Sequence, residues 1–180
     1  DYCLFAVQGP KAAAAMQSLT SVSLADIKFY HFAIGDFAGI ADVIISGTGY
    51  TGAGGFEIYC KNEHVNDIWN AVIKAGEDFG IKPTGLAARD TLRLEAGLCL
   101  YGHELDIEKT PVESNLKWAI SKERLLKGGF IGSDIIISQI KDGTTQIRVG
   151  IKPEGRLIAR EKNKIYNILI KCGYCEKPVQ

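Results

Sequence analysis

Four short segments of the chain are apolar or alternate between apolar and polar residues, as strands with one buried face do. In the last of them, Glu57 lies between Phe56 and Ile58. Successive side chains of a strand point to opposite faces, so Glu57 shares a face with Tyr59 and not with its two neighbours. The pattern predicts strands at residues 2–7, 29–34, 40–46 and 56–60.

A helical period is clearest after residue 62, where five apolar residues have the i, i+3, i+4 spacing of an amphipathic helix: Val65, Ile68, Trp69, Val72 and Ile73. Asn62 is its expected N-cap, and the helix should end within residues 76–80. Three more helices are predicted at residues 10–19, 86–96 and 130–140, and four more strands at 99–101, 118–121, 145–152 and 164–171.

The elements alternate irregularly over short links, so the predicted fold class is α+β rather than a doubly wound sheet. The composition changes at residues 122–129, which predicts one domain at residues 1–122 and a second at 123–180. The first residue, Asp1, opens directly into a predicted strand. We therefore expect the chain to be a piece of a longer protein.

Composition and charge narrow the classes of partner. The 180 residues carry 21 basic and 21 acidic side chains, so the net charge is zero, and Lys and Arg form no run. This balance argues against nucleic acid or an anionic membrane as the main partner. We expect no membrane-spanning segment and no signal peptide.

Five cysteines, an odd number without regular spacing, indicate a reducing compartment. Cys172 and Cys175 have the C-x-x-C spacing of redox and zinc sites. A redox pair needs a helix that lowers the pKa of one thiol, and a zinc site needs two further ligands nearby. Only five residues follow Cys175, so we expect two surface thiols.

The segment at residues 47–55 contains a literal G-x-G-x-x-G pattern, formed by Gly47, Gly49 and Gly52. A dinucleotide site requires a helix that begins inside this motif, whereas a strand-like segment follows here. The segment is then either a glycine hairpin loop, where a positive φ costs little, or a backbone surface for a flat ligand. The hairpin and dinucleotide hypotheses give no role to Tyr50 or Glu57.

Two charged residues are candidates for binding. In the helix predicted at 86–96, Asp90 can pair with Arg93, but Arg89 has no carboxylate three or four positions away. Arg89 therefore has a partner outside its helix or faces solvent. Glu57 is either an exposed strand residue or a ligand group. A guanidinium near a carboxylate can hold a planar ligand, and the alternative is a structural ion pair.

Several blocks of sequence agree, in order, with one known family: LFAVQGPK at residues 4–11, GYTGAGGFEI at 49–58, GLAARDTLRLEAGLCLYGHEL at 85–105, TPVE at 110–113, GFIG at 129–132 and EGR at 154–156. On these blocks the chain resembles the T-protein of the glycine cleavage system, the aminomethyltransferase. The resemblance implies a folate-binding domain of the T-protein type, followed by the start of a C-terminal β-barrel domain.

In that family, an aminomethyl group on the lipoyl arm of the H-protein passes to tetrahydrofolate, which gives 5,10-methylenetetrahydrofolate and ammonia. The resemblance implies tetrahydrofolate as co-substrate, no metal, lipoylated H-protein as partner, and neither nucleic acid nor membrane. It implies that Glu57 and Arg89 bind the folate and that Tyr50 and Tyr101 line the same cleft. A carboxylate suits the two-donor edge of a pterin. The implied location is the bacterial cytoplasm, or the mitochondrial matrix in a eukaryote.

The sequence departs from the family pattern in three ways. Ala53 and Gly54 stand where the commoner loop has two acidic residues, which leaves the spacing of Tyr50 and Glu57 intact. The family's catalytic aspartate lies in a stretch that would precede Asp1. We therefore expect no catalytic residue in these 180 residues and no activity from them alone. The barrel is also expected to be incomplete.

Two other functions use the same module. One belongs to non-enzymatic folate-binding relatives that support iron–sulphur proteins. Cys99 and Glu104 fit their Lys-Gly-Cys-aromatic-x-Gly-Gln-Glu block, but the Lys, the aromatic residue and the Gln are missing. The other belongs to folate-dependent demethylases and to dehydrogenases of methylated glycines, which an attached flavin domain or an altered acceptor pocket distinguishes.

Overall fold

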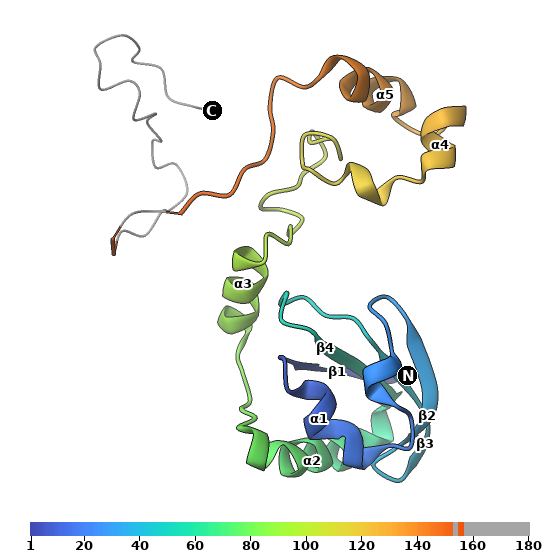
Figure 1. The fold of residues 1–180 in the computed structure, drawn as a ribbon, viewed down its shortest axis with the longest axis vertical. Coiled ribbons are helices and arrows are strands. Elements are labelled where there is room, and N and C mark those ends of the chain that lie inside the picture. Colours follow the sequence, from blue (N-terminus) through green and yellow to red (C-terminus); the bar gives the residue numbers. More distant parts are fainter. Residues whose placement is uncertain (153–154, 157–180) are drawn as a thin grey trace. The chain divides into compact units, whose positions relative to one another are not determined.

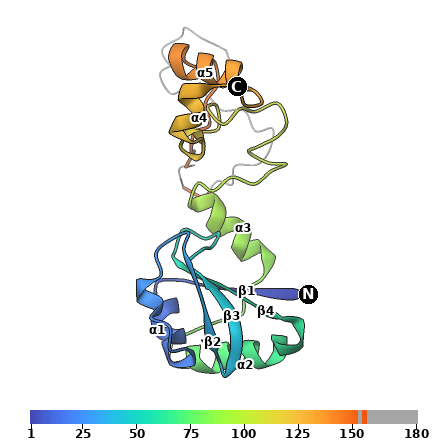
Figure 2. The same cartoon turned by 90° about the vertical axis from the view of Figure 1, so that its right-hand side faces the viewer.

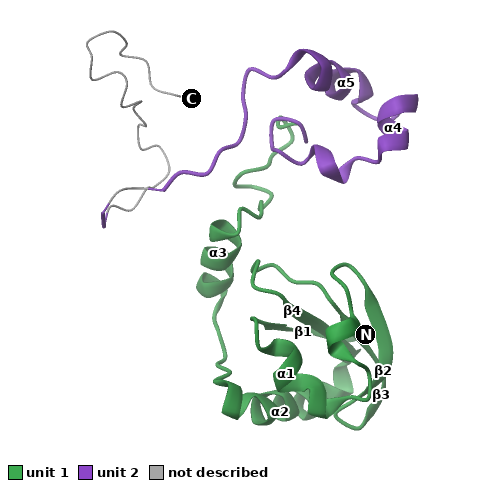
Figure 3. Ribbon diagram, viewed as in Figure 1, with its two compact units in different colours: residues 1–110 green, residues 111–180 purple. Residues whose placement is uncertain are grey.

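The computed structural model describes residues 1–152 and 155–156. The contacts divide the chain into two compact units, the first of which is residues 1–110 (Figure 3). The boundary predicted at residues 122 and 123 stays a prediction.

The first unit contains a four-stranded antiparallel sheet with the strand order β1-β4-β3-β2 (Figures 1 and 2). Its strands are β1 (Tyr2–Gln8), β2 (Phe32–Phe37), β3 (Ile40–Ser46) and β4 (Gly55–Lys61). The strands predicted at residues 2–7, 40–46 and 56–60 are confirmed, as is the α+β class. The pairing of β1 with β4 places residues about fifty positions apart side by side.

One face of the sheet is buried. Phe56 and Ile58 of β4 lie in a core that also includes Met16 of α1 (Ala12–Met16) and Ile68 and Val72 of α2 (Val65–Gly76). The apolar spacing after residue 62 therefore predicted α2 correctly. Burial of these side chains contributes roughly 1.5–3 kcal/mol each to the stability of the unit.

The N-cap prediction is wrong. Asn62 begins a 3-10 turn, η3 (Asn62–His64), and the residue that precedes α2 is His64. The backbone N–H of Val65 bonds to the carbonyl of Asn62, so the chain passes through this turn before the α-helix begins. No side chain caps the first turn of α2.

The opposite face of the sheet is open, and its apolar residues Leu4, Phe32 and Ile34 are exposed. Glu57 and Tyr59 are half-buried there, while their neighbours Phe56 and Ile58 are buried, so the predicted alternation is confirmed. Tyr59 pairs in register with Leu4 on one side and Ile44 on the other.

The strand predicted at residues 29–34 begins late, at Phe32. Residues 28–31 form a turn instead, in which the His31 N–H donates to the Lys28 carbonyl at 2.9 Å and Tyr30 has a φ of 64°. A positive φ at a bulky residue belongs to a turn and not to a strand.

The helix predicted at residues 86–96 is α3 (Leu86–Glu95). The strand predicted at residues 99–101 is wrong, because this segment makes only an isolated bridge between Tyr101 and Leu105. Its Leu100 N–H donates to the Glu104 carboxylate at 3.0 Å, so a side chain satisfies the donor that a neighbouring strand would have satisfied.

The second unit, over its described residues, contains α4 (Lys122–Lys127) and α5 (Ser133–Asp142). The helix predicted at residues 130–140 corresponds to α5, whereas for the residues of α4 the sequence indicates only a change of composition. In the described part of the chain, the short 3-10 helices are η1 (Gln17–Leu19), η2 (Leu24–Asp26), η3, η4 (Glu77–Phe79) and η5 (Lys117–Ala119).

The strands predicted at residues 118–121 and 145–152 are wrong. The first falls on η5. In the second, Arg148 is tied to a loop: its N–H donates to the Glu113 carbonyl at 2.7 Å and its carbonyl accepts from the Asn115 side chain at 2.7 Å. The strand predicted at 164–171, Cys172 and Cys175 lie outside the described residues, and the start of a barrel stays a prediction. Over residues 1–152 and 155–156, no helix has the length and apolar character needed to cross a membrane.

Candidate functional site

The glycine loop at residues 47–55 joins β3 to β4 and carries Tyr50. The Gln8 side chain holds it at both ends, donating to the Thr48 carbonyl and to the Phe56 carbonyl at 3.1 Å each. Gly52, with a φ of 67°, lies so close to α3 that a Cβ there would be 2.5 Å from the Ala96 Cβ. The loop therefore has a defined position between the end of β1 and the end of α3.

Glu57 lies on the open face of the sheet, just after this loop. The Thr48 hydroxyl donates to its Oε2, and the Tyr59 hydroxyl donates to the same oxygen at 3.4 Å. The Ser46 hydroxyl is 3.0 Å from that of Thr48. The other carboxylate oxygen, Oε1, accepts no hydrogen bond from the residues that the structure describes.

Tyr59 is a hydrogen-bond donor beside Glu57. Burial raises the pKa of Tyr59 above its ordinary value, and the nearby charge of Glu57 and the hydrogen bond to it raise the pKa further. A phenol next to a carboxylate thus stays protonated and remains a donor.

Tyr50 connects the loop to α3 and to the segment after it. Its ring lies beneath the Arg89 guanidinium, whose Cζ is 4.6 Å from the ring centroid. Its hydroxyl donates to the Cys99 carbonyl. Arg89 is exposed and, as the sequence indicated, has its contact outside its own helix, but that contact is an aromatic face rather than a carboxylate.

The structure brings the predicted residues together only in part. Tyr50 and Arg89 are in contact, and Glu57 follows the same loop, but in the described part of the chain no ion pair joins Glu57 to Arg89. Tyr101 is 65% exposed and lies two residues beyond the carbonyl to which Tyr50 donates.

Ion pairs of the buried Arg93 fix the segment that carries Tyr101. Arg93, only 2% exposed, donates to Asp90 at 2.8 Å, as predicted, and also to Glu104 at 2.6 Å. Burial would lower the pKa of Arg93, but its hydrogen bonds to both carboxylates raise it. Burial would likewise raise the pKa of Glu104, but the Leu100 N–H and Arg93 lower it.

Sequence reasoning missed Gln8, Thr48 and the pairing of Arg93 with Glu104. Their contacts join residues 9 to 48 positions apart, and no local period encodes such distances. The available signal was the location of Gln8 in the LFAVQGPK block, directly before a Gly-Pro pair.

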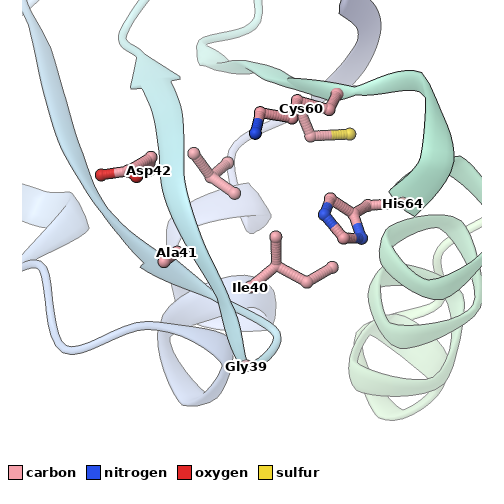
Figure 4. Close-up of a pocket in the computed structure, with 8 residues that line it drawn as sticks. Gly39, Ile40, Ala41, Asp42, Cys60 and His64 are labelled. Atoms are coloured by element: carbon pink, nitrogen blue, oxygen red, sulfur yellow. The ribbon is translucent and has the colours of Figure 1, made fainter.

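A pocket of about 290 Å³ lies elsewhere, lined by residues 39–43 and by Cys60, Lys61 and His64 (Figure 4). It contains none of the four predicted site residues. Of its lining side chains, Cys60 is buried and its thiol has a pKa raised to about 12 by burial and by the Cys3 thiol. It therefore supplies no reactive nucleophile to this pocket.

The fold and the loop define an α+β domain that presents a carboxylate on the open face of its sheet. Residues 1–124 match the family model described as the GCVT N-terminal domain, and the chain belongs to this family.

Curated relatives are similar over most of the chain. An aminomethyltransferase of Flavobacterium psychrophilum is 48% identical over 165 residues, which are 92% of this chain and 45% of the relative. One of Porphyromonas gingivalis is 56% identical over 113 residues, which are 63% of this chain and 31% of the relative. The resemblance to the T-protein is thereby confirmed.

A solved structure agrees in fold. The crystal structure of glycine cleavage system aminomethyltransferase T from Bartonella henselae matches with a TM-score of 0.71 and 34% identity, over 86% of this chain and 41% of that chain. The present chain thus spans less than half the length of these relatives.

Proposed function

We propose that this chain is the folate-binding part of an aminomethyltransferase of the glycine cleavage system. The names of the relatives support this reaction class over the iron–sulphur and demethylase alternatives, as do the Lys, aromatic and Gln residues missing around Cys99. In the proposed reaction, the carbon of the aminomethyl group loses two bonds, one to the sulfur of the lipoyl arm of the H-protein and one to its own amine nitrogen. The one-carbon unit bonds to two nitrogens of tetrahydrofolate, whose two protons leave on ammonia and on the freed thiol.

The observation that carries the proposal is the difference in hydrogen bonding between the two carboxylate oxygens of Glu57. Its Oε2 is occupied by Thr48 and Tyr59, while Oε1 is available on the open face of the sheet. A pterin presents adjacent N–H donors from its 2-amino group and its ring, and a carboxylate accepts both. Glu57 therefore receives the pterin edge in this proposal.

Tyr50 and Arg89 form the second part of the proposed site. The contact of the guanidinium with the Tyr50 ring orients it without neutralising it, so its N–H donors remain available to a carbonyl or carboxylate of the folate. Tyr101, at 65% exposure, is free to lie against the ligand. We assign binding and orientation to these residues and no proton or bond-breaking step. The relatives are bacterial, so we place the reaction in the cytoplasm.

The test is calorimetric titration of tetrahydrofolate, under anaerobic conditions, into the wild-type 180-residue chain and the variants Glu57→Gln and Arg89→Met. Each substitution leaves part of the bound ligand without its partner, so each should weaken binding by roughly 2–4 kcal/mol. Glu63→Gln and Arg124→Met are matched controls, because both residues are exposed and neither is assigned to the site.

The outcomes separate the parts of the proposal. If the wild type does not bind tetrahydrofolate, the proposed function is wrong. If the wild type binds and Glu57→Gln and Arg89→Met bind as tightly as the two controls, the assigned residues are wrong.

A further inference from the structure

Gln8 uses almost all the hydrogen-bonding capacity of its side chain on one loop. Its Nε2 donates to the carbonyls of Thr48 and Phe56, each at 3.1 Å, and its Oε1 accepts from the Thr51 hydroxyl at 3.1 Å. The two carbonyls lie at opposite ends of the glycine loop. A single half-buried carboxamide therefore fixes the separation of the loop ends.

The loop backbone also packs directly against this side chain. A Cβ at Gly49 would be 1.9 Å from the Oε1 of Gln8, and one at Gly55 would be 3.2 Å from its Cδ. The φ of Gly49 is not in the left-handed region, so contact with Gln8, and not backbone conformation, requires glycine there.

The residues to which Gln8 is hydrogen-bonded are close in sequence to Tyr50 and Glu57 or contact them directly. Thr48, whose carbonyl Gln8 holds, uses its hydroxyl to orient the Glu57 carboxylate. Phe56, the other acceptor, directly precedes Glu57, and Tyr50 lies between Thr48 and Thr51. Moving the carboxamide would thus move the carboxylate and the tyrosine relative to each other.

We propose that Gln8 is a positioning residue for ligand binding at Tyr50 and Glu57. This inference rests on the proposed function for the identity of the ligand, tetrahydrofolate. Holding two carbonyls and one hydroxyl of the loop requires two donors and one acceptor on one planar group, and among side chains only an amide supplies them. A glutamate at position 8 would direct carboxylate oxygens at two carbonyl oxygens, and methionine would fill the volume without any hydrogen bond.

Gln17 provides a matched control. Its Nε2 donates to the carbonyls of Thr20 and Val22 at 3.2 and 2.9 Å, and its Oε1 accepts from the Leu24 N–H at 3.0 Å. Gln17→Met therefore removes the same kinds of hydrogen bond from a loop without candidate site residues. Tetrahydrofolate affinity, the thermal midpoint, and hydrogen exchange of the amides at residues 47–57 would be measured for wild type, Gln8→Met, Gln8→Glu and Gln17→Met.

Both Gln8 variants should bind tetrahydrofolate at least about tenfold more weakly than Gln17→Met does, because a misplaced contact contributes little binding energy. The thermal midpoints of the variants should be similar. Amides at 47–57 should exchange faster only in the Gln8 variants. Unchanged exchange in Gln8→Met, or affinity equal to that of Gln17→Met, would overturn the role of Gln8. A wild type that binds no tetrahydrofolate would overturn the proposed function instead, and with it the ligand role of Gln8, while the exchange data would still decide whether Gln8 orders the loop.

Discussion

The Arg89 guanidinium lies over the ring of Tyr50, with its Cζ 4.6 Å from the ring centroid. This contact joins α3 to the glycine loop across 39 positions of sequence, and it gives Arg89 the partner that its own helix lacks. A cation is attracted to the negative face of an aromatic ring and keeps its own N–H donors free. The pair therefore both stabilises the loop and keeps the guanidinium available.

The energy of this contact is accessible to a double-mutant cycle. Arg89→Met and Tyr50→Leu should show a coupling of about 0.5–1 kcal/mol in urea unfolding, the usual range for an exposed cation–aromatic pair. Tyr50→Phe keeps the ring face and loses only the hydrogen bond to Cys99, so the coupling to Arg89 should persist in it. A coupling of zero in the leucine cycle would contradict the contact.

The Arg93–Glu104 pair should make the first unit acid-sensitive. The pKa of Glu104 is lowered in the folded state, so its stabilising contribution is complete above its ordinary value of 4.5 and is lost as the pH falls below it. Glu104→Gln should lower stability near pH 7 by about 1–3 kcal/mol, because the buried Arg93 loses a charged acceptor. The variant should also flatten the loss of stability below about pH 4.5.

Urea unfolding at several pH values measures both effects. Glu63→Gln is the control, since Glu63 is 68% exposed and its contact with His64 at 3.4 Å is a surface pair. Such pairs contribute about 0–1 kcal/mol. An acid slope that is equal in Glu104→Gln and wild type would show that this pair is not the source.

The sequence predicted those contacts of the site whose partners lie close together in the chain, and it missed those whose partners lie far apart. Alternation placed Glu57 on the open face, and helical spacing identified Asp90 as a partner of Arg93, since both follow from local periods. The cation–aromatic contact of Arg89 and the bonds of Gln8 depend on which strands become neighbours. Burial of the whole sheet determines which strands pair, and no single segment determines it.

Two of the failed strands have a common physical cause. Residues 99–101 and 145–152 are apolar enough for strands, but side-chain and loop groups take up their backbone hydrogen bonds: the Glu104 carboxylate for Leu100, and residues Glu113 and Asn115 for Arg148. Strand propensity describes a half-buried surface and does not indicate whether a neighbouring strand exists.

Cys60 should be the least reactive of the thiols in the first unit. It is 1% exposed, its Sγ lies 3.2 Å from that of Cys3, and burial together with that neighbour raises its pKa to about 12. Alkylation requires the thiolate, so iodoacetamide should label the half-buried Cys3 and Cys99 well before Cys60 in the native protein. Mass spectrometry of the labelled peptides measures the order.

The raised pKa of Cys60 should also make the stability of the first unit depend on pH in alkaline solution. A folded-state pKa above the ordinary 9.0 means that the stability linked to the neutral Cys60 thiol is present below pH 9.0 and is lost as the pH rises towards 12. Cys60→Ala should remove this part of the alkaline loss. Equal labelling of Cys60 and Cys99 before unfolding would show that the thiol is not protected.

Gly49 should tolerate no side chain as long as Gln8 is present. A Cβ there would be 1.9 Å from Oε1 of Gln8, so Gly49→Ala must displace the carboxamide, and we expect a loss of stability of about 1–3 kcal/mol. Gly85→Ala is the control: Gly85 has a φ of −89° and no atom within 4 Å of the added Cβ, so its effect should stay within about 0.5 kcal/mol. Because the clash is with one side chain, shortening it in Gln8→Ala/Gly49→Ala should make the second substitution nearly neutral. Urea unfolding of the four variants gives the coupling between the two positions, and strictly additive effects would show that the Gly49 backbone does not lie against Gln8.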